Sequence, residues 1–370
     1  MLSRSYCCVS LANFPIFKPL LTDFYLRYAA PSPQKKMLDI TALTLQTPIT
    51  RLLADVGGTN ARFAWQDAAD APLSDIAVYP CANYDSLQAA IAHYLKAQRK
   101  PSPQWCAIGI ANPVLGDQVQ MTNHHWSFSI AALGAHLGVE QLRVINDFTA
   151  LALALPALGN ADLLAIGGED NAPTDSLNTA TLATKALLGP GTGLGVSGLV
   201  LGNNGVLVPI SGEGGHVSLS AHDAREAGVI AWLTQRFGHA SAERALSGPG
   251  LYNLYTALCA LHGKQAQPLQ PAQVLERAQA SVDPVCTDAL AVFCSLLGSV
   301  AGDLALTLGA RGGVYLGGGI APRITAQLRD SLFRERFVAK GRFRGYLEAI
   351  PTLVIDSRIP AALLGAARAF

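Results

Sequence analysis

Two short glycine-rich turns, each with a threonine, are the segments of this sequence best suited to chemistry on phosphate groups. They are Val56-Gly57-Gly58-Thr59-Asn60 and Pro190-Gly191-Thr192-Gly193, and each follows a predicted strand. Glycine lets the backbone approach a ligand closely, and successive N–H groups in such a turn form an anion-binding concavity. One such turn alone is more simply a hairpin turn. Two matched turns favour a shared phosphate site, with both threonine hydroxyls beside it.

Asp147 is the candidate general base. It ends an apolar strand, and the carboxyl ends of strands are where open α/β sheets place their ligands. A carboxylate there can accept the proton of a hydroxyl group that attacks phosphorus. The alternative is that Asp147 caps a helix beginning near Thr149. The residues alone support the two roles equally.

A set of polar side chains suits a ligand that carries many hydroxyl groups, such as a sugar. Each buried hydroxyl needs a partner, because an unpaired polar group costs about 1–3 kcal/mol. The candidates are Asn123, Asn146, Glu213, His216 and Glu243. Taken singly, each type is more often structural or exposed to solvent. Glu243 in particular could simply sit near the start of a helix.

One glycine motif points to a different class of protein. The segment 193–198 matches GxGxxG, and Glu213 follows Gly193 by 20 residues, as in a dinucleotide site. That fingerprint must open a helix, whereas residues 196–210 have the pattern of a hairpin with the turn Asn204-Gly205. We therefore exclude a dehydrogenase. A Walker A lysine motif is also missing from the sequence.

The elements that must position these residues follow an α/β order that occurs twice. We expect strands at 52–56, 61–65, 76–81, 106–111 and 142–145, with helices capped by Asp85 or Ser86 and by Ser129. The pattern restarts with strands at 186–189, 196–201, 206–210 and 313–316. An internally duplicated α/β protein with a cleft between its halves explains this repeat.

Composition restricts the class of protein further. A chain of 370 residues exceeds what one core usually absorbs, which predicts two domains. The net charge of +1 gives no sign of a nucleic-acid surface. Seven scattered cysteines without zinc spacing are typical of reduced thiols in a cytosolic protein. The apolar segment 289–302 is too short to span a membrane and predicts a buried helix.

Residues 1–48 differ from the rest. Up to Lys36 they contain five basic residues and one acid, Asp23, and four prolines interrupt them. Such a basic, acid-poor segment fits a transit peptide. A disordered extension, or a start codon placed too early with Met37 as the true start, explains it equally well. We expect the catalytic chain to begin near Ile49.

At these residues the chain resembles the bacterial glucokinase family, within the larger hexokinase–actin–heat-shock ATPase fold. The matching segments are 54–62, 121–124, 145–150, 191–196, 212–217, 241–244, 246–251, 317–320 and 340–343, in family order from about Leu52 to the C-terminus. The resemblance implies an α/β fold of two ribonuclease H-like domains with an active-site cleft between them. Here the domains would be 49–157 plus 356–370, and 158–355.

The resemblance also implies an activity: transfer of the ATP γ-phosphate to the 6-hydroxyl of glucose, the entry step of glycolysis, with ATP and Mg²⁺ as cofactors. Asp147 would be the base, and the five polar candidates would hold the sugar. Asp55 would help to place the magnesium ion, through water. The residues implied for ATP are Ala54, Asp55, Val56, Gly57, Gly58, Thr59, Asn60, Gly191, Thr192, Gly193, Gly318 and Gly319. The family is a cytoplasmic homodimer, with no nucleic-acid or membrane partner.

Some features depart from the family pattern. Pro190 stands where a small residue is expected, and the stretch 160–184 is longer than expected, which predicts a surface loop. Three other functions remain open at this point. They are a kinase for another hexose, a sugar-responsive repressor, and a filament-forming or chaperone-like ATPase. The repressor would need a DNA-binding module, and residues 1–48 have no helix-turn-helix pattern.

Overall fold

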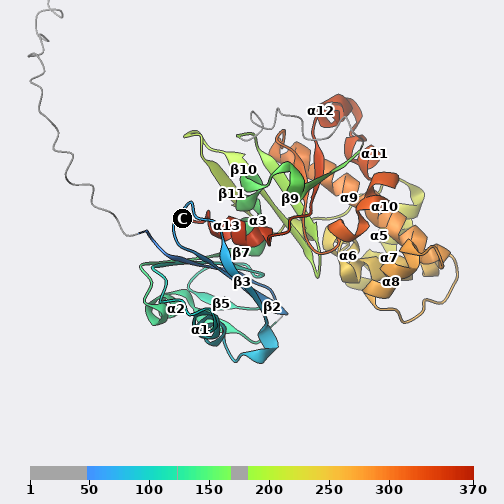
Figure 1. The fold of residues 1–370 in the computed structure, drawn as a ribbon. Coiled ribbons are helices and arrows are strands. Elements are labelled where there is room, and N and C mark those ends of the chain that lie inside the picture. Colours follow the sequence, from blue (N-terminus) through green and yellow to red (C-terminus); the bar gives the residue numbers. More distant parts are fainter. Residues whose placement is uncertain (1–47, 123, 168–181) are drawn as a thin grey trace, which may run out of the picture. The chain divides into compact units, whose positions relative to one another are not determined.

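Two β-sheets with the same strand plan organise the computed structural model, which describes residues 48–122, 124–167 and 182–370 (Figure 1). The first sheet contains β1 (Arg51–Val56), β2 (Asn60–Gln66), β3 (Ser74–Pro80), β4 (Trp105–Ile110) and β7 (Gln141–Asn146). The second contains β8 (Leu163–Ile166), β9 (Lys185–Pro190), β10 (Leu194–Leu201), β11 (Leu207–Ser211), β12 (Val314–Leu316) and β13 (Thr352–Ile355). A separate two-stranded sheet pairs β5 (Gln118–Gln120) with β6 (Ser127–Ser129).

The strand order confirms the predicted duplication. The first sheet runs β3-β2-β1-β4-β7, and the second runs β11-β10-β9-β12-β13 with β8 added at its edge. In both sheets the first three strands of the repeat pair antiparallel, and the next two run parallel to the first. The turns β1–β2 and β9–β10 are therefore equivalent, which places the two glycine-rich turns at matching positions.

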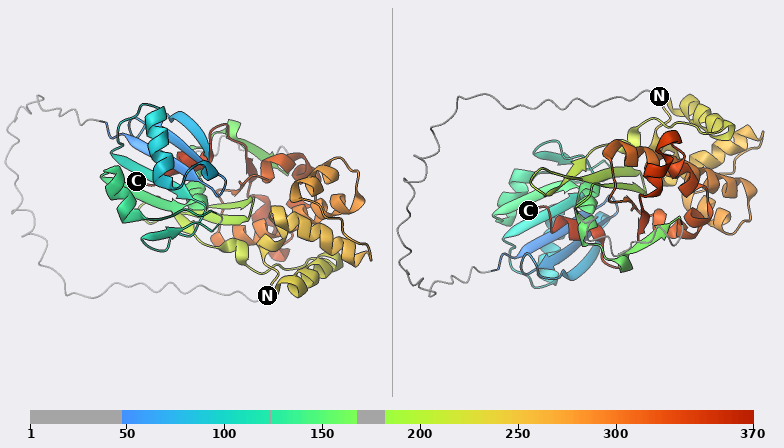
Figure 2. Two further views of the ribbon diagram at one scale, coloured as in Figure 1. Left: turned by 90° about the horizontal axis from the view of Figure 1, so that it is seen from below. Right: turned by 90° about the horizontal axis from the view of Figure 1, so that it is seen from above.

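Helices cover both sheets. They are α1 (Leu87–Ala97), α2 (Ile130–Leu137), α3 (Asp147–Ala154), α5 (Ala224–Phe237), α6 (Ala242–Ala245), α7 (Gly248–Leu261), α8 (Pro271–Gln279), α9 (Pro284–Leu308), α10 (Thr325–Asp330), α11 (Phe333–Val338), α12 (Arg344–Glu348) and α13 (Ala361–Ala366). Helices α5, α7, α8 and α9 build the largest core together with Leu188 and Val196 of the second sheet (Figures 1 and 2). The other face of the same strands packs on α3 through Leu187 and Leu199.

Helices α3 and α13 are equivalent elements of the two repeats, because they follow β7 and β13. They pack against each other (Figure 1). Helix α13 also covers β1 and β4. The contact is close because Gly365 of α13 lies on the backbone of Ala150 in α3, where any larger residue would overlap the carbonyl oxygen. Small residues thus allow the two repeats to meet through these helices.

Helix α9 is the longest element, and it is long and apolar enough to cross a membrane. Its window of highest hydropathy is 67% buried inside the protein, which is the pattern of a core helix. The sequence prediction of a buried helix at 289–302 is confirmed, although the helix extends from Pro284 to Leu308.

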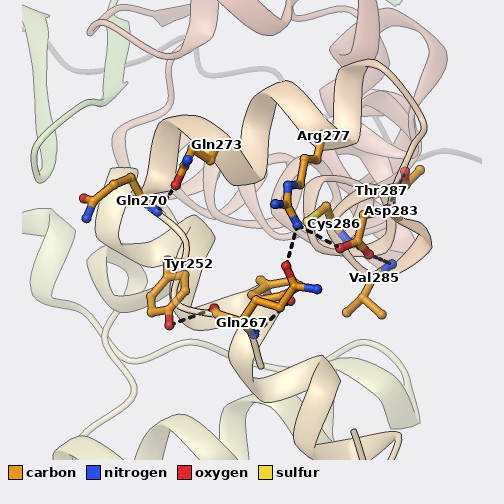
Figure 3. A network of polar contacts seen from close by, with 10 residues as sticks. Tyr252, Gln267, Gln270, Gln273, Arg277, Asp283, Val285, Cys286 and Thr287 are labelled. Carbon is orange, nitrogen blue, oxygen red and sulfur yellow. Dashed lines mark hydrogen bonds and ion pairs between the residues drawn. The ribbon is translucent and has the colours of Figure 1, made fainter. Parts of the chain in front are cut away.

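A polar network fixes the chain between α7, α8 and α9 (Figure 3). Arg277 donates to the side chain of Gln267 at 2.8 Å and lies 3.9 Å from Asp283, which caps α9. The hydroxyl of Tyr252 donates to the Gln267 carbonyl at 3.3 Å. None of these residues lines the cavity described below, so within the described chain the network serves structure.

The local sequence patterns located most of these elements, with four strands missed. Strands β5, β6, β8 and β13 were not predicted, and residue 81 begins a 3-10 turn and does not end β3. The predicted surface loop at 160–184 is wrong at its start, because β8 occupies 163–166 there. Residues 168–181 of that stretch, and the whole segment 1–47, lie outside the described residues. The division into two domains stays a prediction, because residues 48–370 group as one compact unit.

Candidate active site

A cavity of about 500 Å³ lies between the two sheets and is lined by both glycine-rich turns. This volume falls within the usual range for small-molecule sites. Its lining residues are Gly57, Gly58, Thr59, Arg62, Ala111, Asn112, Pro113, Asn146, Asp147, Phe148, Gly189, Gly191, Thr192, Gly193, Leu194, Gly195, Val196, Gly212, Glu213, Glu243, Gly318 and Gly319. The duplicated strand plan therefore brings Gly57 and Gly191, which are 134 residues apart in the sequence, into one site.

The first glycine turn joins β1 to β2 and is held closed from two sides. The Gly57 N–H donates to the Asn60 carbonyl at 2.9 Å. Cys81, which directly follows β3, donates its N–H to the Thr59 carbonyl at 2.8 Å. Its thiol lies 3.4 Å from the Gly57 carbonyl. These bonds occupy carbonyl groups, so the turn can present N–H groups and the Thr59 hydroxyl to the cavity.

The second glycine turn joins β9 to β10 in the same way. The Gly191 N–H donates to the Gly193 carbonyl at 2.8 Å, and Gly248 donates to the Gly191 carbonyl at 2.8 Å. The Glu243 carboxylate accepts the N–H of Leu194 at 2.9 Å. This acceptor, supplied by α6, fixes the end of the turn beside Gly193.

A third glycine turn, Gly317-Gly318-Gly319, follows β12 and packs against the second glycine turn. Ile320 donates to the Pro190 carbonyl at 3.1 Å, and Gly317 donates to the Leu188 carbonyl at 2.7 Å. Gly318 has φ +75°, a conformation that L-residues rarely adopt, and a Cβ on it would overlap the Pro190 carbonyl. Gly319, by contrast, has open space around its Cα.

This difference predicts unequal effects of two neighbouring substitutions. For ATP, the ligand that the sequence resemblance implies, Gly318→Ala should raise the KM, because the left-handed backbone and the Pro190 contact force the third turn away from the second. Gly319→Ala is the matched control for size and should change the KM for ATP less. Steady-state kinetics on both variants measures this. Equal effects would mean that backbone conformation at Gly318 does not shape the site.

Asp147 is the first residue of α3, and its neighbour caps that helix. The side-chain carbonyl of Asn146 accepts the N–H groups of Phe148 at 2.9 Å and Thr149 at 3.2 Å. The alternative in which Asp147 caps the helix is therefore wrong. Its carboxylate accepts the N–H of Phe148 at 2.9 Å and lines the cavity.

The electrostatic surroundings of Asp147 suit a base near neutral pH. Burial, and to a smaller extent the charge of Asp55, raise the pKa of Asp147 to about 7. Hydrogen bonds from the N–H groups of Phe148 and Asp147 and from the Asn146 side chain oppose this rise. A carboxyl group with this pKa is partly ionised at neutral pH and holds a proton more strongly than an ordinary carboxylate.

Asp55 lies on β1 next to the first glycine turn. Its carboxylate pairs with Arg62 at 3.0 Å, directly across the β1–β2 ladder. Burial raises the pKa of Asp55, and the Arg62 guanidinium partly opposes this. Among the described residues that line the cavity, Arg62 carries the only permanent positive charge, whereas Asp147, Glu213 and Glu243 are acidic.

The structure brings together most, but not all, of the predicted site residues. Asn146, Asp147, Glu213 and Glu243 line the cavity, as do Gly57, Gly58, Thr59, Gly191, Thr192, Gly193, Gly318 and Gly319. His216 does not line it: its ring lies 4.0 Å from Glu213, and both side chains are more than half exposed. Ala54, Asp55, Val56 and Asn60 belong to β1 and β2 beside the turn and do not line it. Asn123 lies outside the described residues.

The comparisons with known proteins agree with this site. The sequence pattern of the glucokinase family matches residues 52–370. The chain belongs to the glucokinase family. A glucokinase from Aromatoleum aromaticum is 51% identical over 320 residues, which cover 86% of this chain and 94% of that protein.

Solved structures show the same fold. A glucokinase from an Antarctic psychrotroph has a TM-score of 0.76 at 37% identity, covering 86% of this chain and 98% of that one. A ROK family glucokinase from Streptomyces griseus, solved with glucose and AMPPNP, has a TM-score of 0.55 at 18% identity over 86% of this chain and 98% of that one. The actin-like sugar-kinase fold expected from the sequence is confirmed.

The sequence patterns assigned no role to three residues that line this glucokinase-family site, Arg62, Asn112 and Phe148. Arg62 was not assigned a role, although its pairing with Asp55 follows from the predicted β1–β2 hairpin. Asn112 lies two residues after the end of β4, and its place near the carboxyl end of a parallel strand was the available signal. Phe148 carried no local signal, because its importance depends on glycines far along the chain.

The glycine motif at 193–198 lies mostly on β10 and opens no helix. The strand begins at Leu194 and pairs with β11 through the predicted Asn204-Gly205 hairpin. The exclusion of a dinucleotide fingerprint is therefore confirmed on structural grounds.

Proposed function

We propose that this chain is a glucokinase that transfers the γ-phosphoryl group of ATP to the 6-hydroxyl of glucose, the entry step of glycolysis. The observation that carries the proposal is a single carboxylate with a pKa near neutrality, Asp147, in a cavity lined by two matched glycine turns. Membership of the glucokinase family supports the same reaction and the same substrates.

Each group in the cavity has a chemical task in this proposal. Asp147 accepts the proton of the 6-hydroxyl as that oxygen attacks the γ-phosphorus. N–H groups of the two glycine turns, together with the hydroxyls of Thr59 and Thr192, bind the phosphate oxygens. Gly318 and Gly319 approach the nucleoside part of ATP, since they pack against the second turn.

The remaining polar residues hold the sugar. Glu213 and Glu243 supply carboxylates that accept hydrogen bonds from sugar hydroxyls, and the Asn146 amide group supplies donors. His216 would reach the sugar only after the turn that carries it moves toward the cavity. Such a movement fits closure around the sugar, which would exclude the water that otherwise hydrolyses ATP.

The carboxylates near the first turn fit a magnesium ion. Magnesium is usually held by one or two carboxylates, water and substrate phosphates, and Asp55 supplies a carboxylate on β1 beside the first turn. Asp55 would hold it through water. When bound, magnesium neutralises charge on the phosphate oxygens.

Chelation by excess EDTA should abolish phosphorylation, and added Mg²⁺ should restore it.

The raised pKa of Asp147 predicts that kcat/KM falls on the acid side of the pH profile. Only the ionised carboxylate accepts a proton, so kcat/KM for glucose should rise with pH through about 7 and level off above it. A pH profile of kcat/KM in constant ionic strength measures this acid limb. A flat profile from pH 5.5 to 8.5 would show that no group of this pKa is needed.

A coupled assay with magnesium-ATP and a panel of hexoses tests the activity itself. Formation of glucose 6-phosphate should exceed the phosphorylation of fructose, mannose and N-acetylhexosamines. A preference for one of those sugars would redirect the proposal to another hexose kinase. An ATP hydrolysis rate that does not change when sugar is added would favour a chaperone-like ATPase. DNA binding in a gel-shift assay would favour a repressor.

We also propose that the protein is a cytoplasmic homodimer with no nucleic-acid or membrane partner. The near-neutral net charge and the burial of α9 support this, as does the family membership. Light scattering on the purified protein would test the dimer by its mass.

A further inference from the structure

The aromatic ring of Phe148 occupies a slot in the second sheet formed by two glycines. Gly189 on β9 and Gly195 on β10 are direct partners in the antiparallel ladder. They lie on the face of those strands that packs on α3, together with Leu187 and Leu199. All three members of the slot, Phe148, Gly189 and Gly195, also line the active-site cavity.

The two glycines are required for space and not for backbone conformation. Neither has the positive φ that favours glycine. A Cβ built on either one would lie closer than 3.0 Å to atoms of the Phe148 ring, a separation that real Cβ atoms essentially never show. The ring therefore sits directly on the backbone of the two strands, where a side chain on either glycine would force atoms to shift.

The slot connects the candidate base, Asp147, directly to the strands that carry the second glycine turn. Asp147 is covalently adjacent to Phe148, at the start of α3. Gly189 and Gly195 stand two residues before and two residues after the Gly191-Thr192-Gly193 turn on its own strands. A second tie reinforces the contact, because Thr149 and Ser211 of β11 share a hydrogen bond at 3.0 Å between their hydroxyls.

Helix α3 packs on the second sheet and also contacts the first sheet. Asp147 follows β7 directly, and Ala150 lies against Gly109 of β4. The start of α3 is thus connected to the first sheet by the chain and to the second sheet by the Phe148 ring. A displacement of the ring would shift Asp147 relative to the second glycine turn.

We propose that Phe148 and the Gly189–Gly195 slot are positioning residues that set the distance between Asp147 and the γ-phosphate held by the second glycine turn. This inference rests on the proposed role of Asp147 as the base. Misplacement of a reacting group by about 1 Å can cost about 10²-fold in rate. Filling the slot should therefore lower kcat while the sugar contacts of Glu213 and Glu243 keep the KM for glucose nearly unchanged.

Two substitutions fill the slot from opposite strands. Gly189→Ala places a methyl group against the tip of the ring, and Gly195→Ala places one against its edge. Both should lower kcat by about 10–100-fold, with a small change in the KM for glucose. Gly345→Ala is the control, because Gly345 lies on α12 outside the cavity and has no atom near its Cβ position. It should retain wild-type kcat.

A compensating change separates positioning from general damage. Phe148→Leu removes the ring-tip atoms that would meet a methyl group on residue 189. The double variant Gly189→Ala/Phe148→Leu should therefore recover a large part of the kcat that Gly189→Ala loses. Glucose-binding stoichiometry from calorimetry gives the folded fraction, so kcat is expressed per competent molecule. If Gly189→Ala does not fold, Phe148→Leu alone still tests the idea, because a shortened side chain should lower kcat more than it raises the KM for glucose.

The outcomes distinguish this inference from the function on which it rests. Wild-type kcat in both glycine variants, with Asp147→Asn inactive, would overturn the positioning role and leave the base in place. A kcat loss that the double variant does not relieve would overturn it as well. An active Asp147→Asn variant would instead remove the base, and the positioning role with it.

Discussion

Replacing Asp147 by asparagine is expected to reduce kcat by about 10²–10⁴-fold, the usual contribution of a general base. Asparagine keeps the size of the side chain and removes its ability to accept the proton of the sugar hydroxyl. The KM values should change far less, because both glycine turns and the glutamates remain. Stopped or coupled assays for glucose 6-phosphate measure the loss.

The same variant should keep or gain stability. Burial raises the pKa of Asp147 to about 7, well above that of an exposed aspartate, so the ionised form is disfavoured in the folded protein. A group with a raised folded-state pKa stabilises the fold at low pH, and this contribution is lost as the pH rises through 7. Asp147→Asn has no such loss, so its Tm at pH 8 should equal or exceed that of the wild type.

An exposed aspartate serves as the matched control. Asp330 lies at the end of α10, outside the cavity, and Asp330→Asn makes the same chemical change there. It should leave kcat and Tm near their wild-type values. Near-normal kcat in Asp147→Asn, with a wild-type melting curve, would rule out the base assignment and leave phosphate binding by the turns unaffected.

Local sequence patterns were enough to locate the parts of the site that depend on neighbouring residues. The apolar runs ending at Val56 and at Gly189 predicted strands, and the glycines after them predicted turns. Ser86 and Ser129 were correctly expected as caps for α1 and α2. The repeated order then predicted a duplicated fold, because equivalent turns imply equivalent strands on either side.

The missed elements share a physical reason. Strands β8 and β13 have four residues each and pair with one another at one side of the second sheet, where tertiary contacts decide their conformation. A four-residue apolar run does not distinguish a strand from a buried helical segment. The cap at Asn146 was missed for a similar reason, because asparagine and aspartate are equally good N-caps, and only geometry separates them.

The Phe148 slot was beyond the reach of local patterns altogether. Its two glycines are 41 and 47 residues beyond the phenylalanine, and their lack of a side chain acquires meaning only when α3 packs on β9 and β10. Likewise, the effect of Asp55 on Asp147 depends on the first sheet, which places β1 and β7 on either side of β4. Sequence therefore predicted the candidate groups, and the fold determined their relative positions.

Replacing Asp55 by asparagine is expected to lower kcat by about 10–100-fold, the usual cost of losing a group that holds a metal through its outer shell. The Mg²⁺ concentration that gives half-maximal activity should rise at the same time. A titration with MgCl₂ at saturating glucose measures both effects. Asp75→Asn is the control, since Asp75 forms its ion pair with Lys100 at 2.8 Å outside the cavity.

The pH profile of Asp55→Asn gives a second, independent readout. The charge of Asp55 contributes to the raised pKa of Asp147, so its removal should move the acid limb of kcat/KM to lower pH. Loss of the magnesium contact alone would lower the rate without moving the limb. If the acid limb moves and the Mg²⁺ concentration for half-maximal activity also rises, Asp55 both helps to place the ion and raises the pKa of Asp147. A limb that stays in place would show that burial alone sets the pKa of Asp147.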